Sequence, residues 1–150
     1  MAMIRLPQDF KDFLKLLNSK EVEYLVVGGY AVSYYGYPRS TGDMDVWVAV
    51  QPENIQRLIE VLSEFGFSRE TLPTSLFLEK DQIIRMGMPP IRIEILTSIS
   101  GVDFNECYHS RNVDTVDGVQ INLINLDDLK KNKKAAGRHK DLGDLENLPE

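Results

Sequence analysis

Residues 23–50 combine short apolar runs with glycines in an order that strongly restricts the fold. Tyr24–Val27 is an apolar run typical of a buried strand, and the pair Gly28-Gly29 follows it directly. Residues 30–35 are compatible with a short helix, and residues 36–42 contain the Gly, Pro and Ser that mark a loop. The segment therefore predicts a strand, a glycine turn, a brief helix and a loop that leads into a second strand.

Asp43 and Asp45 stand at the head of that second strand, separated by Met44. Side chains alternate across a strand with period two, so the two carboxylates project from one face, and Met44 and Val46 from the other. Like charges held so close disfavour joint ionisation, and a hard divalent cation relieves the repulsion. The pattern predicts a cation site here, with Mg²⁺ favoured because it binds carboxylate and phosphate oxygens together.

The Gly28-Gly29 pair predicts a phosphate site beside the cation site. Glycine lets the backbone approach a ligand closely, and the helix after the turn directs free N–H groups toward an anion. Tyrosines in this helix either stack on a nucleobase or bury their rings against the sheet.

These residues resemble a known signature. Val27-Gly28-Gly29, a gap of thirteen residues and Asp43-Met44-Asp45-Val46 are similar to the motif of the DNA polymerase β-like nucleotidyltransferase superfamily. The run GGYAVSYYGYPRSTGDMDV resembles the minimal nucleotidyltransferases of toxin–antitoxin and abortive-infection systems. The resemblance is strong over residues 23–50 and weak elsewhere. It implies an α+β fold with a mixed β-sheet and helices packed on one side.

The resemblance also implies roles for individual residues. Gly28 and Gly29 would lie against the nucleotide phosphates, and the two aspartates would hold Mg²⁺, with two ions expected. Arg39 and Thr41 match the family pattern Arg-x-Thr-x-Asp-x-Asp and would position the triphosphate and the loop. Arg39 as a purely structural clamp is the alternative.

A third carboxylate is expected from the segment Ile91–Leu96. Alternation puts the isoleucines on one face and Arg92 with Glu94 on the other. If this strand lies beside the strand of the two aspartates, Glu94 shares their face and becomes a metal ligand or the base that takes the acceptor's proton. Two alternatives stay open: Glu94 is a wet residue of an edge strand, or Asp103 supplies the third acid.

Basic residues gather near the C-terminus. Six of the 17 Lys and Arg residues lie between positions 130 and 140: Lys130, Lys131, Lys133, Lys134, Arg138 and Lys140. This segment either binds polyphosphate or an RNA backbone, or is a solvated helix face. Arg138-His139-Lys140-Asp141 resembles the Arg-x-Lys-Asp segment of many of these nucleotidyltransferases, which implies that Lys140 and Arg138 reach the triphosphate.

Elsewhere, periodicity and turn residues predict the remaining elements. These are helices at 8–20, 51–65 and 103–111, strands at 76–79 and 82–86, a loop at 86–90, a hairpin of 113–116 and 119–124 around Asp117-Gly118, a helix after Asn125 interrupted at Gly137, and a last helical segment from Arg138.

Length and composition limit the number of domains, the compartment and the kinds of site that the chain can have. A chain of 150 residues fits one domain (1–150), and its net charge of −6 argues against non-specific nucleic-acid binding. No apolar run approaches the roughly 20 residues of a membrane span, and the N-terminus lacks a signal-peptide pattern, so we expect a cytoplasmic protein without a membrane partner. Cys107 is the single cysteine, which excludes an internal disulfide, and His109 and His139 have no metal-site or triad spacing.

The residues and the resemblance together predict a Mg²⁺-dependent nucleotidyltransferase. It would move an NMP unit, with ATP as the expected donor, to a hydroxyl group. The resemblance permits a partner protein of a toxin–antitoxin pair, an RNA end or a small aminoglycoside-like acceptor, and the short chain favours a macromolecule that completes the site. The alternative is a catalytically inactive module on the same fold that binds a nucleotide or a partner.

Overall fold

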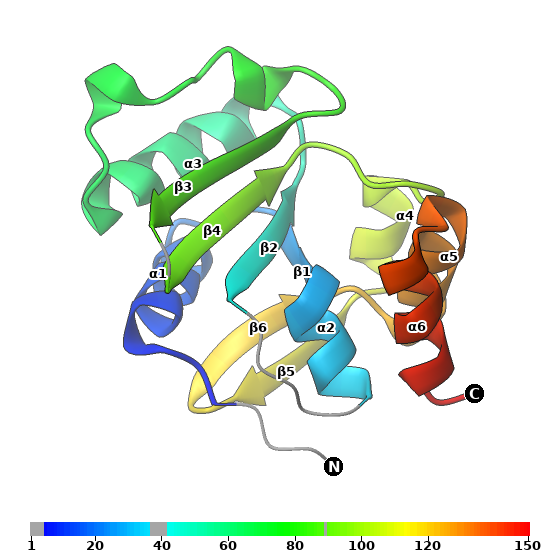
Figure 1. The fold of residues 1–150 in the computed structure, drawn as a ribbon. Helices are drawn as coiled ribbons and strands as arrows, with labels where there is room; N and C mark the ends of the chain where they lie inside the picture. Colours follow the sequence, from blue (N-terminus) through cyan, green and yellow to red (C-terminus); the bar gives the residue numbers. More distant parts are fainter. Residues whose placement is uncertain (1–4, 37–41, 89) are drawn as a thin grey trace.

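The computed structural model describes residues 5–36, 42–88 and 90–150. Within them, six strands form one mixed sheet in the order β3-β4-β2-β1-β6-β5 (Figure 1). The β2–β4 and β1–β6 pairs are parallel, and the other pairs are antiparallel. The strands are β1 (Tyr24–Val27), β2 (Asp43–Val48), β3 (Ile83–Met88), β4 (Ile91–Leu96), β5 (Asn112–Val116) and β6 (Val119–Leu123). The expected mixed sheet is confirmed.

The helices lie on both sides of this sheet, which differs from the one-sided arrangement that we predicted. They are α1 (Gln8–Ser19), α2 (Gly28–Tyr35), α3 (Pro52–Phe65), α4 (Phe104–His109), α5 (Leu126–Ala136) and α6 (His139–Asn147). Figure 1 shows α1 and α3 behind the sheet, α2 in front of it, and α4 to α6 grouped beside α2. The reason lies in β1, whose four residues are all buried, because a strand that is apolar on both faces needs cover on both.

The main core forms between the sheet and the α1–α3 pair. Phe10, Phe13, Leu14 and Leu17 give α1 a fully buried stripe at helical spacing, as its sequence predicted. On the other side of the sheet, Trp47 packs edge-on against Phe104 at the start of α4, with ring centroids 5.0 Å apart.

The region between α3 and β4 departs from prediction. Residues 76–78 form a 3₁₀ turn and not the strand expected at 76–79; Phe77 is buried, and Leu76 and Leu78 are exposed. Strand β3 continues to Met88, opposite Ile91, through residues that we expected to be loop.

Turn and cap residues behave as predicted near the C-terminus. Asp117 and Gly118 have φ of 50° and 82° and close the β5–β6 hairpin. The Asp117 carboxylate accepts a hydrogen bond from the backbone N–H of Leu6 (2.9 Å) and pairs with Lys11, so the hairpin holds the start of the chain. Asn125 caps α5 by accepting from the backbone N–H of Asp128, and Gly137 ends that helix in the left-handed conformation.

Candidate active site

Strands β2 and β4 bring the three predicted carboxylates together. In their parallel register Asp43 lies opposite Arg92, and Asp45 opposite Glu94. Paired residues share a face of the sheet, so Glu94 lies on the face of the two aspartates, as the alternation predicted. Because β4 is flanked by β2 and β3, Glu94 is not a residue of an edge strand.

Asp103, the alternative third acid, lies elsewhere. It caps α4, where its carboxylate accepts from the backbone N–H of Glu106 at 3.2 Å. Together with Trp47 and Thr97 it lines a pocket of about 460 Å³ at the far end of β2, and none of the three carboxylates lines that pocket.

Gly28 lies directly against Asp45. It is the first residue of α2 and has φ of +65°, in the left-handed region that glycine tolerates. A β-carbon at this position would be 2.0 Å from Asp45 Oδ2, so the position has no room for a side chain. The residue that precedes α2 is Val27, whose apolar side chain makes no capping hydrogen bond. The predicted phosphate turn, Gly28 with the buried Gly29 after it, therefore borders the carboxylates.

Asp45 is the most perturbed of the three acids. Burial, a hydrogen bond with Glu94, and the negative charges of Glu94 and Asp43 raise its pKa to about 8, while the charge of Lys140 acts in the opposite direction. Its Oδ1 atom is buried and has no hydrogen-bond partner within residues 5–36, 42–88 and 90–150. A buried acceptor of this kind is unusual in a folded protein and marks a place where a cation or a donor fits.

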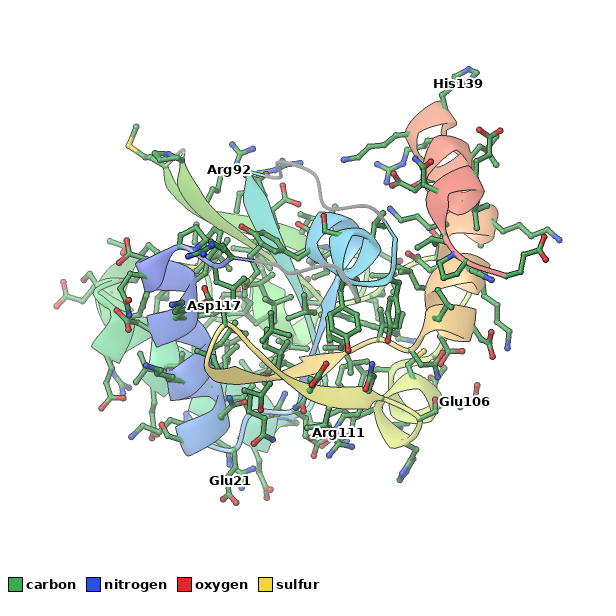
Figure 2. All side chains as sticks on the ribbon, turned by 90° about the horizontal axis from the view of Figure 1, so that it is seen from below. Glu21, Arg92, Glu106, Arg111, Asp117 and His139 are labelled. Carbon is green, nitrogen blue, oxygen red and sulfur yellow. The ribbon has the colours of Figure 1, made fainter. Side chains whose placement is uncertain are left out.

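Arginines pair with the other two carboxylates. Arg92 donates from Nε to Asp43 Oδ1 (3.1 Å) and from Nη2 to Asp43 Oδ2 (2.8 Å), and these bonds hold the pKa of Asp43 below its usual range. Arg85 on β3 donates from Nε to Glu94 Oε1 at 2.8 Å. Figure 2 shows Arg92 at the end of β2 where Asp43 lies. Sequence reasoning gave neither arginine a role, although the alternation already placed Arg92 on the carboxylate face.

The carboxylates fit Mg²⁺ in chemistry but are not assembled around an ion. Within residues 5–36, 42–88 and 90–150, no group of three or more His, Cys, Asp or Glu side chains could hold a metal ion as it stands. Asp43, Asp45 and Glu94 supply the oxygen ligands that Mg²⁺ prefers, and Asp45 Oδ1 is unpartnered. Arg92 and Arg85 engage the other two carboxylates.

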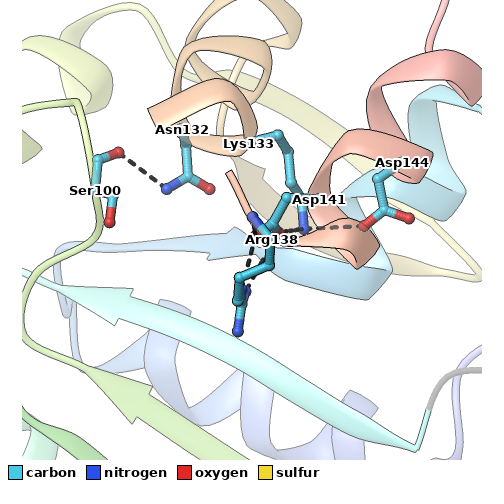
Figure 3. A network of polar contacts seen from close by, with 6 residues as sticks. All are labelled: Ser100, Asn132, Lys133, Arg138, Asp141 and Asp144. Atoms are coloured by element: carbon cyan, nitrogen blue, oxygen red, sulfur yellow. Dashed lines mark hydrogen bonds and ion pairs between the residues drawn. The ribbon is translucent and has the colours of Figure 1, made fainter. Parts of the chain in front are cut away.

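A buried ion cluster joins α5 to α6 (Figure 3). Lys133, only 4% exposed, lies 3.3 Å from Asp141 Oδ1 and 3.1 Å from Asp144 Oδ2 through its Nζ atom. Lys133 therefore belongs neither to a solvated helix face nor to a phosphate-binding surface, the two roles that we considered for the basic segment.

Arg138 and Lys140 extend from the start of α6. Asp141 accepts from Nε of Arg138 at 2.7 Å and also from its backbone N–H, while the Arg138 side chain stays 72% exposed. Both residues interact electrostatically with Asp45, since the charge of Asp45 raises the pKa of Arg138 and Lys140 lowers that of Asp45. His139 lies at the periphery of the molecule (Figure 2). Arg39 and Thr41 lie outside the described residues.

Comparison with solved structures shows a likeness in fold. No protein-family profile matches the chain, and no curated protein sequence matches it. A crystal structure from Thermotoga maritima, of a protein provisionally named a nucleotidyltransferase, superposes with a TM-score of 0.62 over 93% of this chain and 89% of the other, at 18% identity. The two chains share a fold. Among the described helices, none combines the length and the apolar character needed to cross a bilayer.

Proposed function

We propose that this protein is a nucleotidyltransferase that transfers an NMP unit from an NTP to a hydroxyl group. The observation that carries the proposal is the contact between Gly28 and Asp45, because it joins a glycine turn suited to phosphate to a half-buried carboxyl group that has Glu94 beside it. The fold shared with the Thermotoga maritima protein supports this assignment.

Asp43 and Asp45 would hold Mg²⁺, with two ions expected, and Glu94 would either bind the metal near the acceptor or take the acceptor's proton. Bound Mg²⁺ would neutralise charge on the triphosphate and favour attack by the acceptor oxygen. To bind the ion, Asp45 must give up the proton that its raised pKa favours. Its buried position on β2, against Gly28, then fixes where the reacting phosphate lies relative to the turn.

The triphosphate would lie between the start of α2 and the start of α6. Backbone N–H groups at Gly28 and Gly29 would donate to phosphate oxygens. Arg138 and Lys140 would contribute positive charge from the opposite side, and Asp141 keeps the Arg138 guanidinium oriented. From the sequence pattern we assign Arg39 and Thr41 to the same phosphate-binding region.

Glu94 would serve the acceptor side. In this scheme it takes the proton of the acceptor hydroxyl, the hydroxyl oxygen forms a bond to the α-phosphorus, and the bond to the β-phosphate oxygen breaks with departure of pyrophosphate. A role as metal ligand is the alternative. If Glu94 is the base, activity lost on Glu94→Gln should be partly regained at higher pH, where hydroxide or an ionised acceptor replaces it. No recovery at higher pH would speak against the role of Glu94 as base.

For the substrates we propose ATP as donor and a macromolecular acceptor, either a partner protein of a toxin–antitoxin pair or an RNA end. A nucleotide-binding module without turnover is the second candidate function. It is favoured by the arginine pairs on Asp43 and Glu94, which leave no preassembled three-ligand group within the described residues.

The test is transfer of label by the purified protein. Each α-³²P-labelled NTP would be incubated with Mg²⁺ and with total cell protein or total RNA as acceptor. Asp45→Asn should abolish transfer, while Asp127→Asn, the same change at an exposed site on α5, should leave it intact. Equal labelling by Asp45→Asn and the unmodified protein would refute the proposed role of Asp45, and nucleotide binding without transfer would favour the inactive module.

A further inference from the structure

Two of the three candidate ligands already have a cation. The Arg92 guanidinium occupies both oxygens of Asp43, and Arg85 occupies Glu94 Oε1. Asp45, between them in the register, has an Oδ1 atom without a hydrogen-bond partner among the described residues. The site thus holds one carboxyl group with no paired guanidinium in the described part of the chain, and two carboxylates that are neutralised by the protein's own side chains.

A guanidinium on a carboxylate competes with a metal ion for the same oxygens. Its planar fork uses the lone pairs that the ion needs, and its positive charge repels a second cation nearby. The pairs lie toward solvent, with side-chain exposures of 60% for Arg85 and 34% for Arg92. Because partly exposed ion pairs are weak, both guanidinium groups can leave without unfolding the sheet.

We propose that Arg92, assisted by Arg85, is a stand-in for the metal: its guanidinium group occupies the metal-binding carboxylates while no metal is bound. A divalent metal must displace the guanidinium groups, so the metal binds tightly only together with the nucleotide. The triphosphate supplies the coupling because guanidinium groups bind phosphate oxygens as well as they bind carboxylates. In the absence of nucleotide the arginines stay on Asp43 and Glu94. This inference rests on the proposed function, since it assumes that these carboxylates bind metal.

The experiment measures Mn²⁺ binding by electron paramagnetic resonance, with and without a non-hydrolysable ATP analogue. The unmodified protein should bind Mn²⁺ weakly alone and at least tenfold more tightly with the analogue. Arg92→Gln should bind Mn²⁺ alone about fivefold more tightly, the value of one exposed ion pair, and gain less from the analogue. Arg92→Lys should fall between the two. Arg57→Gln removes an arginine on α3 that contacts only a backbone carbonyl at 3.3 Å, and should change nothing.

The outcomes separate this inference from the function beneath it. Equal or weaker Mn²⁺ binding by Arg92→Gln, in a protein whose Mn²⁺ site is lost on Asp45→Asn, would overturn the stand-in role and leave the metal site standing. Mn²⁺ binding that does not depend on Asp45 would overturn both. Arg85→Gln provides a second test if Arg92→Gln fails to fold, as judged by circular dichroism, and should shift Mn²⁺ affinity in the same direction.

Discussion

Gly28 leaves the space that the Asp45 carboxyl group occupies: a β-carbon on residue 28 would lie 2.0 Å from Asp45 Oδ2. A structural change at Gly28 should therefore displace the half-buried side chain of Asp45, and a change at Asp45 should displace the turn at Gly28. This relationship gives the first prediction.

Gly28→Ala should reduce nucleotidyl transfer by at least about a hundredfold. The added methyl group would collide with Asp45, and alanine disfavours the φ of +65° at this position, so both effects displace the Asp45 carboxyl group. The matched control is Gly66→Ala, at the end of α3, where φ is also positive (+125°) but no atom lies within 4 Å of the added carbon. Both variants should melt at lower temperature, and only Gly28→Ala should lose transfer. Comparable loss of activity in both would show that backbone strain alone is responsible.

Metal-free protein should lose stability as the pH rises. The pKa of Asp45 is about 8 in the folded protein against 3.8 ordinarily, so the unfolded chain releases this proton first and stability declines between those two values. Asp43 and Asp141, whose pKa values are lowered, stabilise the fold fully above their ordinary value of 3.8 and lose that contribution only as the pH falls below it, so they do not cause the decline.

Asp45→Asn should remove much of this decline. With EDTA present, it should melt roughly 3 to 6 °C higher than the unmodified protein at about pH 8.5, and close to it at about pH 5. Thermal unfolding followed by circular dichroism measures both values. Parallel pH profiles of the two proteins would contradict the raised pKa of Asp45.

Lys133→Met should destabilise the protein by about 3 to 5 kcal/mol, because it leaves Asp141 and Asp144 buried without their shared cation. Lys134→Met is the neighbouring control at an exposed position and should change stability by less than about 0.5 kcal/mol. Urea denaturation gives both free energies of unfolding. If the two substitutions had equal effects, the cluster would not hold α6 on α5.

Lys140→Gln should weaken NTP binding about tenfold, the effect expected from one charge-assisted contact with phosphate. Its effect on the rate at saturating NTP should be small if Lys140 binds the ground state and the transition state equally. Lys134→Gln removes the same charge from α5 and should bind NTP normally. An unchanged affinity in Lys140→Gln would exclude a direct phosphate contact.

Much of the candidate site follows from local rules. Strand alternation placed Asp43 with Asp45 on one face of their strand and Arg92 with Glu94 on one face of theirs, and Asp117-Gly118 specified its hairpin; that the two faces coincide comes from the pairing of β2 with β4. Each of these inferences depends on residues within a few positions of one another.

The parts that escaped prediction depend on distant partners. Lys133 can be buried because Asp141 and Asp144 neutralise its charge, and both lie on another helix, at least eight positions away in the sequence. The Arg85–Glu94 pair exists because β3 lies beside β4, and sequence spacing does not fix that register. Three consecutive apolar residues around Phe77 carry no period, so strand and 3₁₀ turn could not be distinguished there.

The hydrogen bond from Leu6 to Asp117 joins positions 111 residues apart. Helix α1 follows Leu6, packs against β6, and bonds to it again through Asn18 and the carbonyl of Gln120. During synthesis on the ribosome, the apolar stripe of α1 must therefore wait, without its native cover from β6, until nearly the whole chain has emerged. The contact of α1 with α3 can form once residue 65 has been made, whereas its contact with β6 must wait for residues 119–123.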